Sequence, residues 1–149
     1  MRIAIGCDHA AYAEKEEIKA YLESKGIEVV DKGCYSPDRA NYPQYAAAVA
    51  RAVTQGEVER GVLICGTGIG MSIVANKFKG IRATLCHNAF TAQACREHND
   101  SNVLCMGARV LDIAQMKEIV DIWLTTEFGG GRHAERLAMI TELENELQK

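Results

Sequence analysis

Residues 62–72 read VLICGTGIGMS, an apolar run that gives way to glycines at positions 66, 68 and 70. Such a run, followed by glycines and a helical pattern, is typical of a buried parallel strand, a tight turn and a helix N-terminus. Glycine lets a backbone approach a ligand closely, and free N–H groups with the helix dipole favour negative charge there. The segment therefore predicts an anion-binding cradle, with the Cys65 thiol and the Thr67 hydroxyl at its edge.

Two nucleotide-binding signatures that use a glycine loop do not fit this segment. A dinucleotide site requires G-x-G-x-x-G and an acidic residue about twenty positions later. This loop is G-x-G-x-G, and residues 83–95 hold no Asp or Glu. A Walker A loop fails because Gly-Lys-Ser/Thr does not occur. From the loop alone, a plain strand–helix turn with an inert buried thiol remains the other explanation.

The chain on both sides of this segment alternates strand and helix patterns. Besides the central strand, we expect strands at residues 2–7, 27–31, 82–86 and 102–106, and helices at 12–24, 45–53, 73–78, 89–97 and 113–127. A loop with two prolines covers residues 33–43. Repeated strand–helix units form a mostly parallel sheet with helices on both faces, so the predicted fold class is α/β, in a single domain over residues 1–149.

Polar residues follow three of the predicted strands. Asp8 and His9 come after the first strand, the glycine cradle after the central one, and Arg109 after the last. Ligands of parallel α/β sheets bind at the carboxyl ends of the strands, so we expect these residues to share one edge. The alternative is that Asp8 only caps a helix and that His9 is a solvated turn residue.

Residues 127–136 read EFGGGRHAER and open a helical pattern that runs to residue 147. Arg132 and Arg136 are one helical turn apart at its N-terminal end, where cations are unfavourable unless an anion binds. Guanidinium groups suit phosphate. The alternative is a solvated basic face with Glu135 as an ion-pair partner. His98, in the polar run 96–102, is by itself more typical of a helix C-terminus than of a catalyst.

Composition excludes several classes of function. The chain has 149 residues, 48% hydrophobic and 25% charged, and its net charge of −3 argues against nucleic acid or anionic membrane as a partner. It has no apolar run of membrane-spanning length and begins with a strand pattern, so we expect a cytoplasmic protein. Its six cysteines include no C-x-x-C and its histidines no H-E-x-x-H, so we expect reduced thiols and no metal site. Cys86 and Cys105 fit small buried hydrophobes.

Several motifs together match a known family. They are Gly6-Cys7-Asp8-His9-Ala10, the loop at residues 64–72, Ala75-Asn76-Lys77, Gly80-Ile81-Arg82-Ala83, Arg96-Glu97-His98-Asn99-Asp100, Gly107-Ala108-Arg109-Val110 and Gly130-Gly131-Arg132-His133. In this order they resemble the ribose-5-phosphate isomerase B family, which includes allose- and galactose-6-phosphate isomerases. The resemblance implies a Rossmann-like three-layer α/β/α sandwich with a mostly parallel five-stranded sheet and a C-terminal helical arm. It also implies a phosphorylated sugar as substrate, no cofactor, and a homodimer or dimer of dimers with shared active sites.

The resemblance also assigns roles at matching positions. Cys65 corresponds to the base that moves a proton between C1 and C2, and His98 to the acid that opens the sugar ring. The backbone nest for the enediolate corresponds to Gly66, Thr67, Gly68, Ile69 and Gly70. The hydroxyl-binding set corresponds to Asp8, His9 and Asn99, with Thr67 and Tyr42 as auxiliaries, and the phosphate ligands to Arg109, Arg132 and Arg136. Some members use a glutamate base a few residues after the cysteine, but Met71 and its neighbours offer no carboxylate.

General chemistry agrees with these residue types. Removal of a proton next to a carbonyl creates an enediolate, and backbone N–H groups of a glycine nest stabilise such a charge. We therefore expect an isomerase that interconverts ribose 5-phosphate and ribulose 5-phosphate. The alternatives are an isomerase of a hexose 6-phosphate, allose or galactose, and a non-catalytic phosphosugar-binding module. A thiol-redox enzyme would need a resolving cysteine spaced close to Cys65, and none is.

Overall fold

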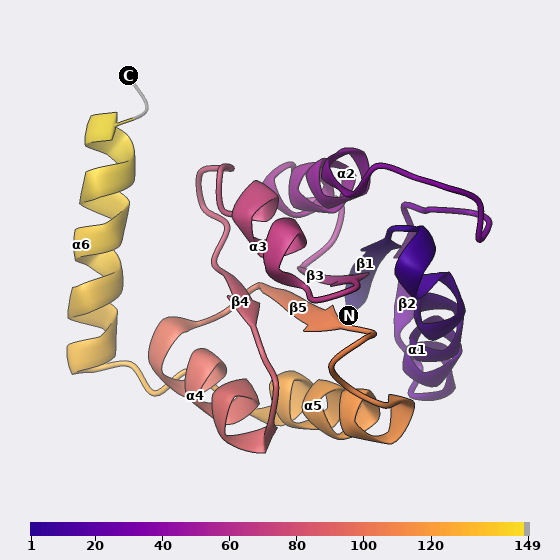
Figure 1. Ribbon diagram of the computed structural model, residues 1–149. Coiled ribbons are helices and arrows are strands. Elements are labelled where there is room, and N and C mark those ends of the chain that lie inside the picture. Colours follow the sequence, from indigo (N-terminus) through magenta and orange to yellow (C-terminus); the bar gives the residue numbers. More distant parts are fainter. Residues whose placement is uncertain (148–149) are drawn as a thin grey trace.

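The computed structural model describes residues 1–147 and forms a parallel sheet covered by helices (Figure 1). In chain order the elements are β1 (Arg2–Cys7), the 3-10 helix η1 (His9–Ala11), α1 (Tyr12–Ser24), β2 (Glu28–Asp31), α2 (Tyr42–Thr54), β3 (Arg60–Cys65), α3 (Ile69–Ala75), β4 (Ala83–Leu85), α4 (Ala89–Asn99), β5 (Val103–Gly107), α5 (Ile113–Thr125) and α6 (Arg132–Leu147). No helix within residues 1–147 is long and apolar enough to cross a membrane.

The five strands run in the order β2-β1-β3-β5-β4, and every neighbouring pair is parallel. In this register Cys7 lies beside Ile64, and Cys65 lies beside Gly107. The carboxyl ends of β1, β3 and β5 therefore meet at one edge of the sheet. From β1 the chain goes to β2 on one side and then crosses to β3 on the other, so a crevice opens between β1 and β3, where α/β proteins bind ligands.

Strand side chains alternate between two apolar layers, which confirms the three-layer α/β/α architecture. Ile3, Ile5 and Cys7 of β1 belong to the core that includes side chains of α1, α4 and α5. Ala4 belongs to the core that includes side chains of α2 and α3, and so does Cys65 at the end of β3. The inner strands are buried along nearly their whole length, which explains their continuous apolar sequences.

The expected elements all form, but several of their ends differ. α2 begins at Tyr42 rather than at residue 45, because Pro43 fits the first turn of a helix, where its missing N–H is not needed. α3 begins at Ile69 rather than at residue 73, because Gly68 in the left-handed conformation starts it directly after the turn. α4 continues to Asn99, two residues beyond the expected end, and α5 stops at Thr125.

Helix α6 stands beside the sandwich as the expected C-terminal arm (Figure 1). None of its residues is buried. It touches the body where His133 stacks on His98 of α4, and where the carboxylate of Glu144 accepts a hydrogen bond of 2.8 Å from the Gly80 N–H. Its apolar side chains Met139, Ile140 and Leu143 face solvent. A helix with an uncovered apolar face suggests a partner, because such faces are normally buried.

Candidate active site

The Cys65 thiol lies at the carboxyl end of β3, at the start of the glycine turn. The residue is buried, with 6% of its surface exposed, and Sγ accepts a hydrogen bond of 3.1 Å from the Gly68 N–H. The turn therefore holds a thiol that can act as a base beside a set of backbone donors.

Glycine is required at position 68 for two physical reasons. Its φ of 80° lies in the left-handed region, and a Cβ there would come within 2.9 Å of the Met106 backbone carbon. The Thr67 hydroxyl accepts a hydrogen bond of 3.2 Å from the Ile69 N–H, which closes the turn on its outer side. The backbone path of the cradle is thus set by its own side chains and by the packing of β5 behind it.

The loop after β5 supports the cradle through its backbone. The Ala108 N–H donates to the Cys65 carbonyl at 2.8 Å, and the Arg109 N–H donates to the Gly66 carbonyl at 2.9 Å. These contacts lay the Arg109 side chain over Gly66, where a Cβ would meet the guanidinium at 3.1 Å. The exposed Arg109 guanidinium therefore lies next to the turn and brings positive charge to it.

Cys65 and its turn line an open hollow of about 410 Å³ together with residues from α2, α3, the β5–α5 loop and the turn after β1. The lining residues are Asp8, Tyr42, Cys65, Gly66, Thr67, Ile69, Gly70, Ile73 and Arg109. Small-molecule sites in proteins commonly measure about 300–1,000 Å³, so the hollow is large enough for a phosphorylated sugar. The expectation that three strand ends share one edge is confirmed.

Asp8 and His9 lie on the β1 side of this edge. Asp8 lines the hollow and also caps η1, because its Oδ1 accepts a hydrogen bond of 3.0 Å from the Ala10 N–H. The capping alternative is therefore correct, but it does not take the side chain out of the hollow. His9 is exposed, and its Nδ1 lies 3.1 Å from the Ala40 carbonyl oxygen and 3.2 Å from the Ala40 nitrogen. Residue 40 of the proline-containing loop thus orients the imidazole.

A second group of candidate residues lies on α4 and α6. His98 and Asn99 form the last turn of α4, and Arg132 and Arg136 occupy the first turns of α6. The His98 and His133 rings are stacked, with centroids 4.4 Å apart and planes inclined by 18°. The pKa of His133 is lowered by desolvation and by the nearby charges of His98, Arg132 and Arg136. This end of the arm therefore gathers cationic and imidazole groups.

The arginines of the arm have no carboxylate partner within residues 1–147. Neither Arg132 nor Arg136 forms an ion pair there, so the surface pair with Glu135 considered above does not form. Both guanidinium groups are exposed. Two cations at a helix N-terminus without counter-charges are arranged to attract an anion.

The structure does not bring His98 into the hollow of Cys65 within one chain. His98 instead lines a smaller hollow of about 140 Å³ with Phe90, Gln93, Ala94 and Glu97. His98 does not act as a helix C-cap either, because α4 ends at Asn99 and Asp100 is its C-cap. The candidate residues therefore form two groups, one around Cys65 and one at the contact between α4 and α6.

The other cysteines are buried free thiols, and two pairs of them lie close together. The Sγ atoms of Cys7 and Cys34 are 3.6 Å apart, and those of Cys86 and Cys95 are 3.7 Å apart. Neither pair includes Cys65, which weakens the thiol-redox alternative. Burial raises the pKa of Cys105, and a hydrogen bond with Cys95 together with burial raises that of Cys86, in keeping with their expected role as small hydrophobes. Among residues 1–147, no three His, Cys, Asp or Glu side chains are placed as metal ligands would be.

Sequence reasoning missed two contributors to this region. Ile73 lines the hollow, one helical turn after Ile69, and a correct start for α3 would have predicted it from the four-residue spacing. His133 stacks on His98 from a separate element, and no spacing in the sequence indicates that contact.

A parallel α/β sandwich with a cysteine and a backbone anion cradle at its switch point defines a Rossmann-like enzyme class that acts on small anionic substrates. A model of the family "Ribose/Galactose Isomerase" matches residues 3–140, and the chain belongs to this family. The resemblance noted from the sequence motifs is therefore confirmed.

Relatives cover nearly the whole chain. It is 52% identical over 143 residues to ribose-5-phosphate isomerase B of Escherichia coli, with 96% of each chain covered. It is 45% identical over 148 residues to D-erythrulose-4-phosphate isomerase of Pectobacterium atrosepticum, covering 98% of this chain and 97% of that one. Among solved structures, ribose-5-phosphate isomerase B of Clostridium thermocellum superimposes with a TM-score of 0.97 at 48% identity, over 99% of both chains.

Proposed function

We propose that this protein is an aldose–ketose isomerase that interconverts ribose 5-phosphate and ribulose 5-phosphate. The observation that carries the proposal is the buried Cys65 thiol, which accepts the Gly68 N–H inside a hollow lined by the glycine turn. Cys65 takes the proton from C2 of the open-chain aldose and returns it to C1, while a proton moves from O2 to O1. The intermediate enediolate is stabilised by the backbone N–H groups of the turn. This proton transfer needs no metal or redox cofactor.

The furanose form of ribose 5-phosphate hides its carbonyl, so the ring must open first. An acid protonates the ring oxygen while the proton of the C1 hydroxyl is lost to a base. His98 is suited to the acid role, because an imidazolium group can donate a proton to the ring oxygen. Asp8, His9 and Asn99 hold the sugar hydroxyls in this proposal, with Thr67 and Tyr42 beside them.

The phosphate group is held by arginines. Arg109 lies next to the cradle, and Arg132 and Arg136 lie on the arm without carboxylate partners in the described part of the chain. Guanidinium groups bind phosphate through charge-assisted, often paired hydrogen bonds. The distance from the cradle to these arginines sets the length of the sugar that fits between them.

The two groups of residues are united in a homodimer, or in a dimer of dimers. Ile69, Ile73 and Val110 are all at least half exposed around the cradle, and the arm exposes Met139, Ile140 and Leu143. A second copy of the chain covers both apolar surfaces at once, because a two-fold interface uses the same patches on each subunit. It also brings His98, Asn99 and the arginines of the arm to the Cys65 hollow. The whole chain, residues 1–149, then acts as one sugar-phosphate isomerase domain.

The reducing cytoplasm suits this protein. All six cysteines are free thiols, including two pairs close enough to contact each other, and disulfides rarely persist in that compartment. A phosphorylated sugar as substrate agrees with the same location.

The experiment that tests the proposed function compares kcat/KM for ribose 5-phosphate, allose 6-phosphate, galactose 6-phosphate and D-erythrulose 4-phosphate. We expect ribose 5-phosphate to be preferred by about tenfold or more, which is the discrimination that one carbon allows. A clear preference for a hexose or for the four-carbon sugar would replace the proposed substrate. Tight binding of these sugars without turnover of any of them would favour the non-catalytic binding module.

A further inference from the structure

Helix α4 ends abruptly, directly after His98 and Asn99. The residue that ends it, Asp100, has φ 47° and ψ 49°, and within residues 1–147 it is the one non-glycine residue with a positive φ. Side chains other than glycine rarely adopt this conformation, although Asp and Asn tolerate it best. A strained residue next to candidate catalytic groups calls for a reason in its surroundings.

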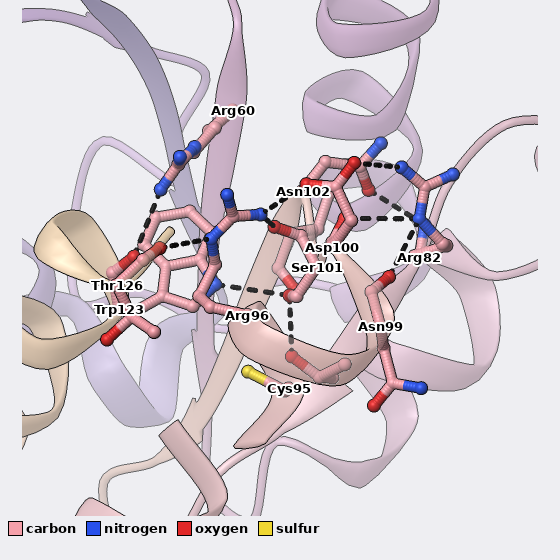
Figure 2. A network of polar contacts seen from close by, with 12 residues as sticks. Arg60, Arg82, Cys95, Arg96, Asn99, Asp100, Ser101, Asn102, Trp123 and Thr126 are labelled. Atoms are coloured by element: carbon pink, nitrogen blue, oxygen red, sulfur yellow. Dashed lines mark hydrogen bonds and ion pairs between the residues drawn. The ribbon is translucent and has the colours of Figure 1, made fainter. Parts of the chain in front are cut away.

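Two arginines hold the Asp100 carboxylate from opposite sides (Figure 2). Arg96, which is buried with 5% of its surface exposed, donates to Oδ1 at 2.8 Å. Arg82, at the start of the β4 segment, donates to Oδ2 at 3.3 Å. Because one guanidinium is buried and both are charged, this carboxylate is fixed much more firmly than an ordinary surface side chain.

The same arginines also hold the backbone of the turn. The Arg82 Nε donates to the carbonyls of Asn99 at 3.0 Å and Asp100 at 3.1 Å, and Arg96 donates to the carbonyl of Ser101 at 2.6 Å. The last carbonyls of a helix have no partner inside the helix, and here the Arg82 guanidinium supplies one for Asn99. The end of α4 that carries His98 and Asn99 is therefore tied to Arg82 from outside the helix and to Arg96 from within it.

The clamp is anchored in the core. Ser101 is fully buried, and its Oγ lies 2.7 Å from the Thr84 hydroxyl and accepts a hydrogen bond of 3.1 Å from the Trp123 indole. The Arg96 Nε also reaches the Thr126 carbonyl at the end of α5, at 3.3 Å (Figure 2). In contrast, the side chains of His98 and Asn99 are exposed. The network thus fixes their backbone, while both side chains remain exposed and the His98 ring rests on His133.

We propose that Asp100, clamped between Arg82 and Arg96, is a positioning residue for the ring-opening step. It acts through the backbone of α4, by setting the direction in which His98 and Asn99 project from the last helical turn. This inference rests on the proposed function, in which His98 opens the sugar ring and Cys65 moves the proton. Disturbing the clamp therefore impairs ring opening and spares proton transfer.

Two reactions separate these steps. Conversion of ribose 5-phosphate requires both, because the sugar is supplied as a furanose. Ribulose 5-phosphate has no furanose form, because its O5 carries the phosphate. In D2O the enzyme exchanges one of the two C1 hydrogens of this ketose for deuterium, because the thiol that removed the proton exchanges it with solvent and returns a deuteron, and this exchange requires proton transfer alone. The first reaction is followed by ketose formation and the second by proton NMR.

Asp100→Gly and Asp100→Asn are the principal variants. Glycine accepts the positive φ but lacks the carboxylate, and asparagine keeps the shape but lacks the charge. We expect Asp100→Gly to lower kcat for ribose 5-phosphate by about tenfold to a hundredfold, the usual cost of a small displacement of a catalytic group, while exchange into ribulose 5-phosphate stays within about twofold of wild type. Asp100→Asn should lower kcat for ribose 5-phosphate less, and His98→Asn should lower it more. In both variants the exchange into ribulose 5-phosphate should again stay close to wild type.

Asp121→Asn is the matched control, because this carboxylate also has charged and hydroxyl partners, Lys25 and Tyr21, but lies on α5 away from the clamp. It should lower both reactions equally or neither. The same result for the Asp100 variants would overturn the inference, and so would wild-type conversion of ribose 5-phosphate. If neither Asp100 variant folds, Arg82→Met provides the same comparison. Failure of the unmodified protein in both reactions would instead contradict the proposed function.

Discussion

The Cys65 cradle and the α4–α6 region, which we propose contribute to one reaction, are built in different ways. The cradle is formed at three strand ends of one sheet, with its thiol buried and its turn hydrogen-bonded to neighbouring loops. The α4–α6 region presents exposed side chains on a helix end and on an arm that buries none of its residues. If the proposed dimer forms, proton transfer depends on the fold of one chain, whereas ring opening and phosphate binding depend on how two chains meet.

The largest effect we expect comes from the centre of the cradle. Cys65→Ala should lower kcat by at least about 10²-fold, because a general base is lost, and should leave binding of the phosphorylated sugar nearly intact. Steady-state kinetics and calorimetric titration measure the two quantities.

Cys105→Ala is the control for this change, since it removes a buried thiol from the neighbouring strand. It should reduce stability slightly and retain turnover. Near-normal turnover of Cys65→Ala would remove the thiol from the mechanism and with it the distinction between the two regions.

A smaller effect should come from the arm. Arg132→Ala or Arg136→Ala should chiefly raise KM, by about ten- to a hundredfold, because a charge-assisted contact to phosphate contributes about 1.5–3 kcal/mol in both ground and transition states. Some loss of kcat should follow, since phosphate binding helps to place the sugar over Cys65.

Arg51→Ala is the comparison for the arm, because this exposed arginine stacks on Phe78 on the opposite side of the sheet from α4. Its KM should match wild type. A fall in kcat at unchanged KM for the Arg132 and Arg136 variants would mean that these residues do not bind the phosphate in the ground state.

The smallest effect on turnover should come from the ion pair between Lys15 of α1 and Asp31 of β2. Lys15 is fully buried and donates to both oxygens of Asp31, at 2.9 and 2.8 Å, and to the Cys34 carbonyl at 2.7 Å. Lys15→Met leaves the Asp31 carboxylate with only the longer contact of 3.4 Å to Lys19 and the Gly33 N–H, so it should lower the free energy of unfolding by up to about 3–5 kcal/mol with little change in kcat. Urea unfolding gives the first quantity.

The pH dependence of this destabilisation follows from two pKa shifts. Burial alone would raise the pKa of Asp31, but hydrogen bonds from Lys15 and Gly33 outweigh it and hold the pKa below the usual 3.8. Burial alone would lower the pKa of Lys15, but hydrogen bonds to Asp31 and Glu16 outweigh it and raise the pKa above 10.5. The contribution of the pair is therefore complete between these two values, is lost as pH falls through the folded pKa of Asp31, and is lost as pH rises through that of Lys15.

The difference in the free energy of unfolding between wild type and Lys15→Met should accordingly be constant at neutral pH and should shrink below about pH 4. If this difference in the free energy of unfolding stays the same at about pH 3, packing rather than charge accounts for the contribution of Lys15 to stability.

The cradle could be predicted from the sequence because its parts follow from local rules. A β-branched run, alternating glycines and a helical pattern indicate Cys65 and its turn, and parallel strands place Asp8 and Arg109 at the same edge. The predicted start of α3 was wrong by four residues. A seven-residue helix is too short for its apolar periodicity to show that Gly68 precedes the first turn.

The α4–α6 region could be predicted only in part. The spacing of Arg132 and Arg136 is visible in the sequence, but the stacking of His133 on His98 depends on where the arm docks. The clamp on Asp100 was missed for a similar reason, since Arg82 and Asp100 are far apart in the sequence and meet only through the packing of α4 beside β4. Contacts made between elements, rather than within them, leave no periodic signal.

Complementation between two impaired variants, assayed at a substrate concentration too low for either to turn over well, tests most directly the claim that one site is built from two chains. Cys65→Ala lacks a working cradle but keeps an intact arm, and the double variant Arg132→Ala/Arg136→Ala has the opposite defect. After mixing in equal amounts, with subunit exchange verified by pull-down of differently tagged chains, we expect recovery of about a quarter of wild-type activity, because half of the dimers are hybrids with one intact site in two. A mixture that exchanges subunits yet stays as inactive as its parents would contradict the claim and show that each arm serves its own chain.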